Sequence, residues 1–139
     1  MSHFTELHLD LNDQTCLVEA LTAMGYGGKV EVHPAPVALI GYDGKPRMLG
    51  DHEVRAEIVI RREHLWSAAN DIGFARQPDG KYVAYISEYD RRVQPKWHER
   101  VVQEYGVAKS TTALRKEGWT VTVTRDKGVA KVHGVRYGR

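Results

Sequence analysis

Residues 54–61 alternate between apolar and charged side chains, and Val59 is the one exception. Successive side chains of a β-strand point to opposite faces of a sheet, so the segment predicts a strand with one buried and one solvated face. Parallel sheets are buried on both faces, whereas antiparallel sheets often leave one face in water. The segment therefore favours an antiparallel sheet. Its predicted buried side consists of Val54, Ala56, Ile58 and Ile60.

Further segments have the composition of strands and are separated by turn-forming residues. Pro78-Asp79-Gly80-Lys81 predicts a hairpin turn, and Asp126-Lys127-Gly128 predicts a second turn near the end of the chain. The strands expected from these patterns are 3–9, one beginning at Val30, 37–42, 71–75, 82–89, 119–124 and 129–135.

Two stretches carry apolar residues at helical spacing. The first follows Asn12-Asp13, which can cap a helix, and ends at Gly25. The second begins at Pro95, and Gly106 is expected to kink or interrupt it before it resumes over 110–117. The apolar stripes are Leu17, Leu21 and Met24 in the first helix, and Trp97, Val101, Tyr105 and Ala108 in the second.

The two helices end in the same pattern. Ala20-Leu21 is followed after three residues by Gly25-Tyr26, and Ala113-Leu114 is followed at the same spacing by Gly118-Trp119. Glycine adopts the left-handed conformation that closes a helix, and the aromatic residue can pack back on it. The repeated pattern predicts that both helices pack in a similar way on one face of the sheet.

The bulk composition fits one folded domain. A chain of 139 residues with 42% hydrophobic and 27% charged residues can bury a core, and no apolar run approaches the roughly 20 residues that span a bilayer. Cys16 is the single cysteine, which favours a reducing, cytoplasmic setting. We expect one α+β domain over 1–139: an antiparallel sheet of about six to eight strands with two main helices on one face, and a Pro/Gly-rich insertion at about 33–53.

No recognisable catalytic, cofactor-binding or metal-binding motif is present. The seven histidines show no paired spacing of the kind that holds zinc, and no Walker loop or nucleophile-elbow sequence occurs. Cys16 is interpreted as a small buried thiol. We therefore predict no catalytic residue, no cofactor and no metal. An enzyme of unrecognised type would need a pocket that gathers several of His3, His8, His52, Asp71 and Glu88.

Three short sequence motifs occur in a characteristic order. They are Met1-Ser2-His3-Phe4-Thr5, then Asp71-Ile72-Gly73-Phe74, then a stretch from Gln103-Glu104-Tyr105 to Gly118-Trp119. In this order they resemble the ycf-thirty-five-like family of hypothetical chloroplast and cyanobacterial reading frames, an uncharacterised family with wider bacterial relatives. The chain departs from that pattern in its insertion, at Gly106 and over 87–92. The resemblance implies an accessory role alongside AAA-type ATPases and small ferredoxin-like partners, and it supplies no catalytic residues.

The first functional hypothesis is a non-catalytic, cytoplasmic accessory or adaptor protein that binds other proteins, in an AAA-type ATPase-containing complex. Trp66 follows a segment without clear periodicity and is a candidate exposed anchor for a partner. Its alternative role is to plug the edge of the core. His52, in the Asp51-His52-Glu53 cluster of the insertion, is the second candidate for partner binding.

The second hypothesis is a nucleic-acid-binding module. The net charge of +2 is uneven, because residues 71–139 hold 14 Lys and Arg against eight acids. Basic residues on an open sheet face can hold phosphates. A solvated polar strand face is the plainer reading of the same residues. The candidate residues, centred on the C-terminal hairpin, are Arg91, Arg92, Arg125, Lys127, Lys131, His133, Arg136 and Arg139.

Overall fold

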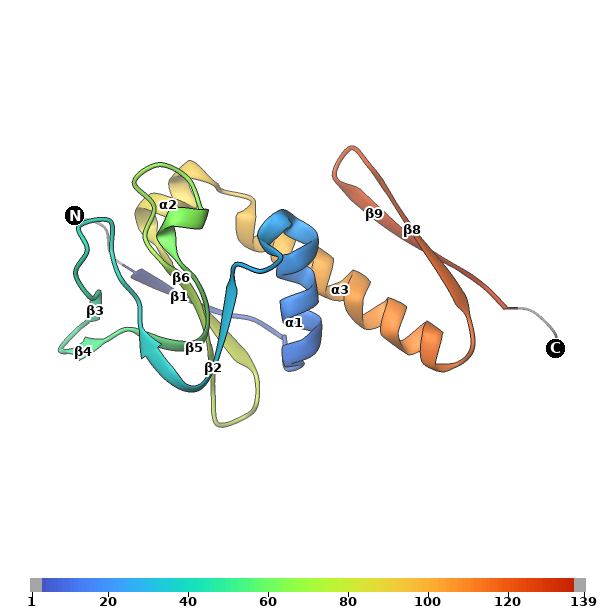
Figure 1. The fold of residues 1–139 in the computed structure, drawn as a ribbon, viewed down its shortest axis with the longest axis horizontal. Coiled ribbons are helices and arrows are strands. Elements are labelled where there is room, and N and C mark those ends of the chain that lie inside the picture. Colours follow the sequence, from blue (N-terminus) through green and yellow to red (C-terminus); the bar gives the residue numbers. More distant parts are fainter. Residues whose placement is uncertain (1–3, 137–139) are drawn as a thin grey trace.

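The computed structural model describes residues 4–136, and its centre is a five-stranded antiparallel sheet in the order β1-β7-β6-β5-β2 (Figure 1). Within it, β7 lies between β1 and β6, and β5 lies between β6 and β2. The strands are β1 (Phe4–His8), β2 (Val30–Ala38), β5 (Arg55–Ile60), β6 (Ile72–Arg76) and β7 (Tyr82–Ser87).

Two helices cover one face of this sheet (Figure 1). Helix α1 (Gln14–Leu21) is capped by Asp13, whose carboxylate accepts the backbone N–H of Cys16 at 3.0 Å. Helix α3 (Trp97–Lys116) packs beside α1, and its Tyr105 hydroxyl accepts the backbone N–H groups of Asn12 and Asp13. The α+β class, the antiparallel sheet and the two main helices are thus confirmed.

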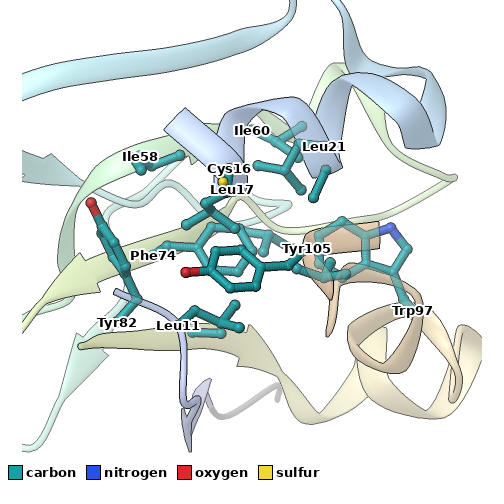
Figure 2. Packing of buried hydrophobic residues seen from close by; sticks show 14 of the residues in the cluster. Leu11, Cys16, Leu17, Leu21, Ile58, Ile60, Phe74, Tyr82, Trp97 and Tyr105 are labelled. Atoms are coloured by element: carbon teal, nitrogen blue, oxygen red, sulfur yellow. The ribbon is translucent and has the colours of Figure 1, made fainter. Parts of the chain in front are cut away.

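The main core lies between the helices and the sheet (Figure 2). Trp97 stacks on Phe74 of β6 with 6.4 Å between ring centroids, and its indole N–H donates to the Tyr26 hydroxyl at 3.0 Å. Leu17, from the predicted stripe of α1, is completely buried in the same cluster. Together these contacts fix both helices on the sheet, since packing of an apolar face stabilises a helix more than its intrinsic propensity does.

A second, smaller core covers the opposite face, and it changes one prediction. Ile58 and Ile60 lie under the helices as expected, but Val54 and Ala56 belong to the second cluster together with Val59. The pairing of β2 with β5 also shifts register between Val32 and Val37, so the sheet is irregular beside this part of β5. The members of the second cluster are Phe4, Leu39, Val54, Ala56, Val59 and Ala75.

The insertion supplies the cover for this second face. Its first residues continue β2 as far as Ala38, and Leu39 then turns in and is completely buried. The remainder forms a loop closed by a bridge between Ile40 and Pro46, followed by a two-stranded hairpin of β3 (Met48–Leu49) and β4 (His52–Glu53). Residues 33–53 therefore pack on the main sheet and cover part of its second face.

The end of the chain differs most from expectation. Helix α3 runs through Gly106 without a break, because Tyr105 and Ala108 on either side of it are buried in the core. The closing strands β8 (Thr120–Asp126) and β9 (Val129–Val135) form their own two-stranded sheet beside α3 (Figure 1). The predicted strand 82–89 ends at Ser87, which caps the short helix α2 (Glu88–Val93).

Both predicted glycine closures are present. Gly25 has φ of 104° within the kinked turn η1 (Thr22–Tyr26), and Gly118 has φ of 90° after α3. These left-handed values explain why glycine recurs at the two positions. A single 3₁₀ turn, η2 (Arg62–His64), connects β5 towards β6.

Candidate interaction surface

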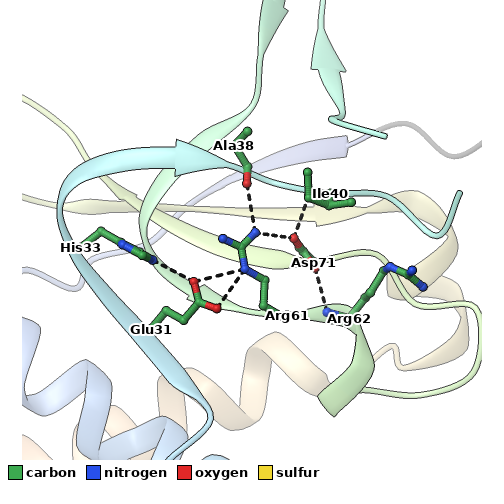
Figure 3. A network of polar contacts seen from close by, with 7 residues as sticks. All are labelled: Glu31, His33, Ala38, Ile40, Arg61, Arg62 and Asp71. Atoms are coloured by element: carbon green, nitrogen blue, oxygen red, sulfur yellow. Dashed lines mark hydrogen bonds and ion pairs between the residues drawn. The ribbon is translucent and has the colours of Figure 1, made fainter. Parts of the chain in front are cut away.

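Asp71 fastens the base of the insertion to the sheet (Figure 3). Its side chain is 1% exposed, and Oδ2 accepts the backbone N–H of Ile40 at 2.7 Å and Nη1 of Arg61 at 2.8 Å. The other oxygen accepts the backbone N–H of Arg62 at 2.7 Å. In return, the Asp71 N–H donates to the Ile40 carbonyl. These hydrogen bonds satisfy a carboxyl group that would otherwise be costly to bury, and they hold the loop in one position.

Arg61 extends this network to the edge strand β2 (Figure 3). It donates to Glu31 at 3.0 Å and to the Ala38 carbonyl at 3.1 Å. Burial acts to raise the pKa of Glu31, but hydrogen bonds from Arg61 and His33 outweigh it and leave that pKa below its usual value. Arg61 thereby connects both ends of the irregular part of β2.

Asn70 fastens the loop at a second point. Its amide oxygen accepts the Tyr42 N–H at 3.0 Å and two guanidinium N–H groups of Arg47 at 3.4 Å. Its amide nitrogen donates to Ser87 at 3.0 Å and to Asp90 at 3.2 Å. Asn70, Ser87 and Asp90 are all buried, so this chain of hydrogen bonds ties the insertion to the start of α2.

The fastened loop presents apolar side chains to solvent. Tyr42, Met48 and Leu49 are 49%, 50% and 39% exposed, and Arg47 stacks over the Tyr42 ring with 5.1 Å to its centroid. The predicted partner-binding residue His52 lies opposite Leu49 across the β3–β4 pair, with its side chain 84% exposed. We call Tyr42, Met48, Leu49 and His52 the insertion tip.

Trp66 lies elsewhere and is only partly buried. Its indole N–H donates to Asp90 at 2.9 Å, and its ring meets Trp97 edge-on at 6.3 Å. These contacts match its alternative role as a plug at the edge of the helix-covered core. Its connection with the insertion tip is indirect: Asp90 also accepts from Asn70, whose amide oxygen accepts the Tyr42 N–H. Sequence reasoning missed Tyr42, Met48 and Leu49. The signal that could have found them is the presence of large apolar residues in a segment rich in glycine and proline.

The C-terminal hairpin has two distinct faces. Its outer face is exposed and carries the pairs Thr122–His133 and Thr124–Lys131, as the sequence indicates. Lys127 sits in the turn with φ of 51°, also exposed. The valine-containing inner face is half-buried against α3, and at its base Gly134 lies against Leu114 and Trp119.

Arg125 is on the inner face, where it forms two hydrogen bonds with Glu104 of α3. The Glu104 side chain is 7% exposed, and the hydrogen bonds from Arg125 hold its pKa below the usual value. Arg125 is therefore neutralised and docks the hairpin on the helix. Arg136 is exposed after β9, whereas Arg139 lies outside the described residues.

Arg91 and Arg92 are placed away from the hairpin. They belong to α2, which precedes the start of α3, while the hairpin lies along the later part of that helix (Figure 1). The seven candidate nucleic-acid residues that the structure describes are thus divided between α2 and the C-terminal hairpin with the residue after it. Exposed basic residues of the hairpin that are not engaged by Glu104 include Lys127, Lys131 and His133.

The residues proposed for an enzyme site are dispersed. His8, His52, Asp71 and Glu88 line four different cavities, and His3 lies outside the described residues. Within residues 4–136 no three His, Cys, Asp or Glu side chains are grouped so as to hold a metal ion. Cys16 is 2% exposed, and burial, followed by the charge of Asp13, raises the pKa of its thiol. A protonated thiol is a poor nucleophile.

Among the described helices, none has the length and apolar character required to cross a lipid bilayer.

Comparison of the sequence with known protein families identifies one family to which the chain belongs. Residues 20–133 match the family model described as "Protein of unknown function (DUF1257)", and the chain belongs to that family. No curated protein and no solved structure matches the chain significantly. The resemblance to an uncharacterised family is thus confirmed at this level.

Proposed function

We propose that this protein is a non-catalytic accessory protein that binds a partner protein through the insertion tip. The observation that carries the proposal is the exposure of Tyr42, Met48 and Leu49 within the insertion, Tyr42 in its loop and the other two in its hairpin. Aromatic residues and methionine are enriched in the cores of protein–protein interfaces. Apolar groups exposed within an otherwise polar segment support a role in protein contact.

The mounting of the loop supports the same role. Asp71 and Asn70 hold it by hydrogen bonds to the backbone of Ile40 and Tyr42. A loop that is already ordered loses little conformational entropy when it binds, so more of the contact energy appears as affinity. The dispersal of the candidate catalytic groups over separate cavities further favours binding over catalysis.

The resemblance to the ycf-thirty-five-like family extends the proposal. It points to a cytoplasmic complex that contains an AAA-type ATPase as the setting in which the insertion tip binds. The insertion is where the chain departs from that family pattern, so its partner contact is particular to chains that carry such an insertion.

The test is an affinity capture from nuclease-treated lysate with three forms of the full chain. The wild-type protein is compared with Met48→Ser/Leu49→Ser and with the control Val129→Ser/Val135→Ser, which alters two exposed apolar residues of the hairpin. We expect the insertion-tip variant to lose the captured protein and the hairpin control to retain it. Equal capture by all three forms would contradict the proposal.

A second candidate function is nucleic-acid binding by the outer hairpin face. The observation that favours it is the exposed cross-strand pairing of Thr124 with Lys131 and of Thr122 with His133. Such binding should weaken steeply with salt, because each phosphate contact releases counterions. Titration of a single-stranded oligonucleotide at two salt concentrations tests it. Lys127→Gln/Lys131→Gln should lower both the affinity and the salt dependence.

A further inference from the structure

A cavity of about 550 Å³ lies beside α2, and none of its lining residues belongs to the insertion tip or to the hairpin. It is lined by Thr5 of β1, by Glu88, Arg91 and Arg92 of α2, and by Pro95. Its volume falls in the range of small-ligand sites, roughly 300–1,000 Å³. The proposed partner-binding role uses none of these residues, so the cavity invites a separate explanation.

Arg91 is held in place by a neutral partner. The Thr5 hydroxyl donates to the Ile86 carbonyl at 2.8 Å, which leaves its lone pairs to accept Nη1 of Arg91 at 3.3 Å. Arg91 is half-buried. Among the described residues, the bond to Thr5 is the one hydrogen bond that its guanidinium group makes. A guanidinium has five N–H donors, so most of its donors are available to a ligand.

The charge of the cavity is not neutralised within residues 4–136. Glu88 precedes Arg92 by four residues, a spacing at which helical residues commonly pair. The ion pairs of the described residues nevertheless include neither Arg91 nor Arg92. Two guanidinium groups against one carboxylate leave the cavity with a net positive charge. A positively charged cavity with preset N–H donors is complementary to an anion.

We propose that this cavity binds the phosphate monoester group of a small molecule, with Arg91 and Arg92 as its ligands. Guanidinium groups can form two parallel hydrogen bonds with phosphate oxygens, so arginine is well suited to bind a phosphate group. A phosphate monoester carries close to two negative charges at neutral pH, which suits two arginines. Among residues 4–136 no aromatic side chain lines the cavity, so recognition is directed at the phosphate and not at a stacked base.

The test measures binding of inorganic phosphate and phenyl phosphate to the full chain by calorimetry, with acetate as the singly charged comparison. The variant is Arg91→Gln/Arg92→Gln. The matched control is Arg115→Gln/Lys116→Gln, which removes two adjacent, exposed basic residues from another helix. We expect saturable binding of both phosphates, at least about tenfold weaker in the α2 variant and unchanged in the control. Acetate should bind more weakly than either.

A second readout uses pH and Thr5. Binding should weaken as the pH falls below about 6, where the phosphate monoester loses one of its two charges. Thr5→Val, which removes the acceptor for Arg91, should weaken binding several-fold and serves if the double variant fails to fold. Three results would overturn the proposal: no saturable binding, equal loss in the α2 variant and the control, or tighter binding of an oligonucleotide or phosphoserine peptide by the same arginines.

Discussion

Leu39 packs directly on Gly73, at the position where any other residue would carry its side chain. A Cβ built on Gly73 would lie 2.8 Å from Cδ2 of Leu39 and 2.7 Å from Cβ of Ala56. Both neighbours are completely buried, so neither can move aside freely. Glycine at this place in β6 lets the insertion approach the sheet closely enough to seal its second face.

Gly73→Ala is therefore expected to destabilise the protein. The added methyl group must displace Leu39 or Ala56 in a packed core, which typically costs about 1–3 kcal/mol. Urea unfolding of the variant and of the wild type measures the difference.

Gly106→Ala is the matched control for that substitution. Nothing lies within 4 Å of a Cβ built there, and the residue sits inside α3 with ordinary helical neighbours. Alanine favours the helix over glycine by about 0.5–1 kcal/mol, so this variant should be more stable than the wild type. A loss of stability on this substitution, equal to that at Gly73, would show that the close approach of Leu39 is not the cause.

Asp71→Asn should loosen the insertion. The change removes the charge that Arg61 faces and leaves an N–H₂ group where an acceptor is needed. Breaking one side of such a buried pair costs about 3–5 kcal/mol. We expect a lower unfolding midpoint in urea and faster hydrogen exchange at the Ile40 amide, which donates to Asp71. Asp51→Asn, at a side chain 89% exposed, should change neither measurement appreciably.

The docking of the hairpin on α3 should depend on pH. Hydrogen bonds from Arg125 lower the pKa of Glu104 below its usual 4.5, so the folded state favours the carboxylate more than the unfolded state does. The resulting stabilisation is present above pH 4.5 and is lost as the pH falls through the lowered pKa. Amide chemical shifts of β8 and β9 between pH 6 and pH 3 report the undocking. Glu104→Gln should show no such transition at this site.

Cys16 should resist thiol reagents in the folded protein. It is almost completely buried and its pKa is raised, so little thiolate is present at neutral pH. Because it is the single cysteine, modification by a chromogenic disulfide reads this thiol alone. We expect complete reaction in denaturant and a rate more than about tenfold lower without it. Fast modification of the native protein would mean that the thiol is accessible.

The sequence predicts the elements of this fold because each has a local cause. The turn at Gly80 has φ of 85°, the glycines after both helices have positive φ, and Asp13 caps α1. Each of these features depends on a few neighbouring residues, which is why spacing and composition are sufficient to find them.

The arrangement on the second sheet face could not be predicted in the same way. Val59, the one apolar residue on the expected wet side of its strand, is completely buried there, so the interruption of the pattern was itself the signal of a second cover. The cover comes from Leu39, which is distant in sequence. No local pattern specifies which segment packs on which face.

The candidate site shows the same division. The motif Asp71-Ile72-Gly73-Phe74 has a structural explanation. Asp71 binds the loop backbone, and Gly73 leaves room for Leu39. Ile72 and Phe74 lie in the helix-covered core. These roles follow from long-range contacts and were not visible in the sequence. Arg125 was assigned to the basic surface for the same reason, since its partner Glu104 is on a different element.

The insertion closes on itself at the bridge between Ile40 and Pro46, and its hydrogen bonds to Asp71 and Asn70 lie at or near that closure. The loop residues between Ile40 and Pro46 contribute little to the packing of the sheet. Substitutions there are therefore expected to leave the scaffold intact. In this respect the insertion resembles an antibody loop on its framework, where recognition diversifies and folding is inherited.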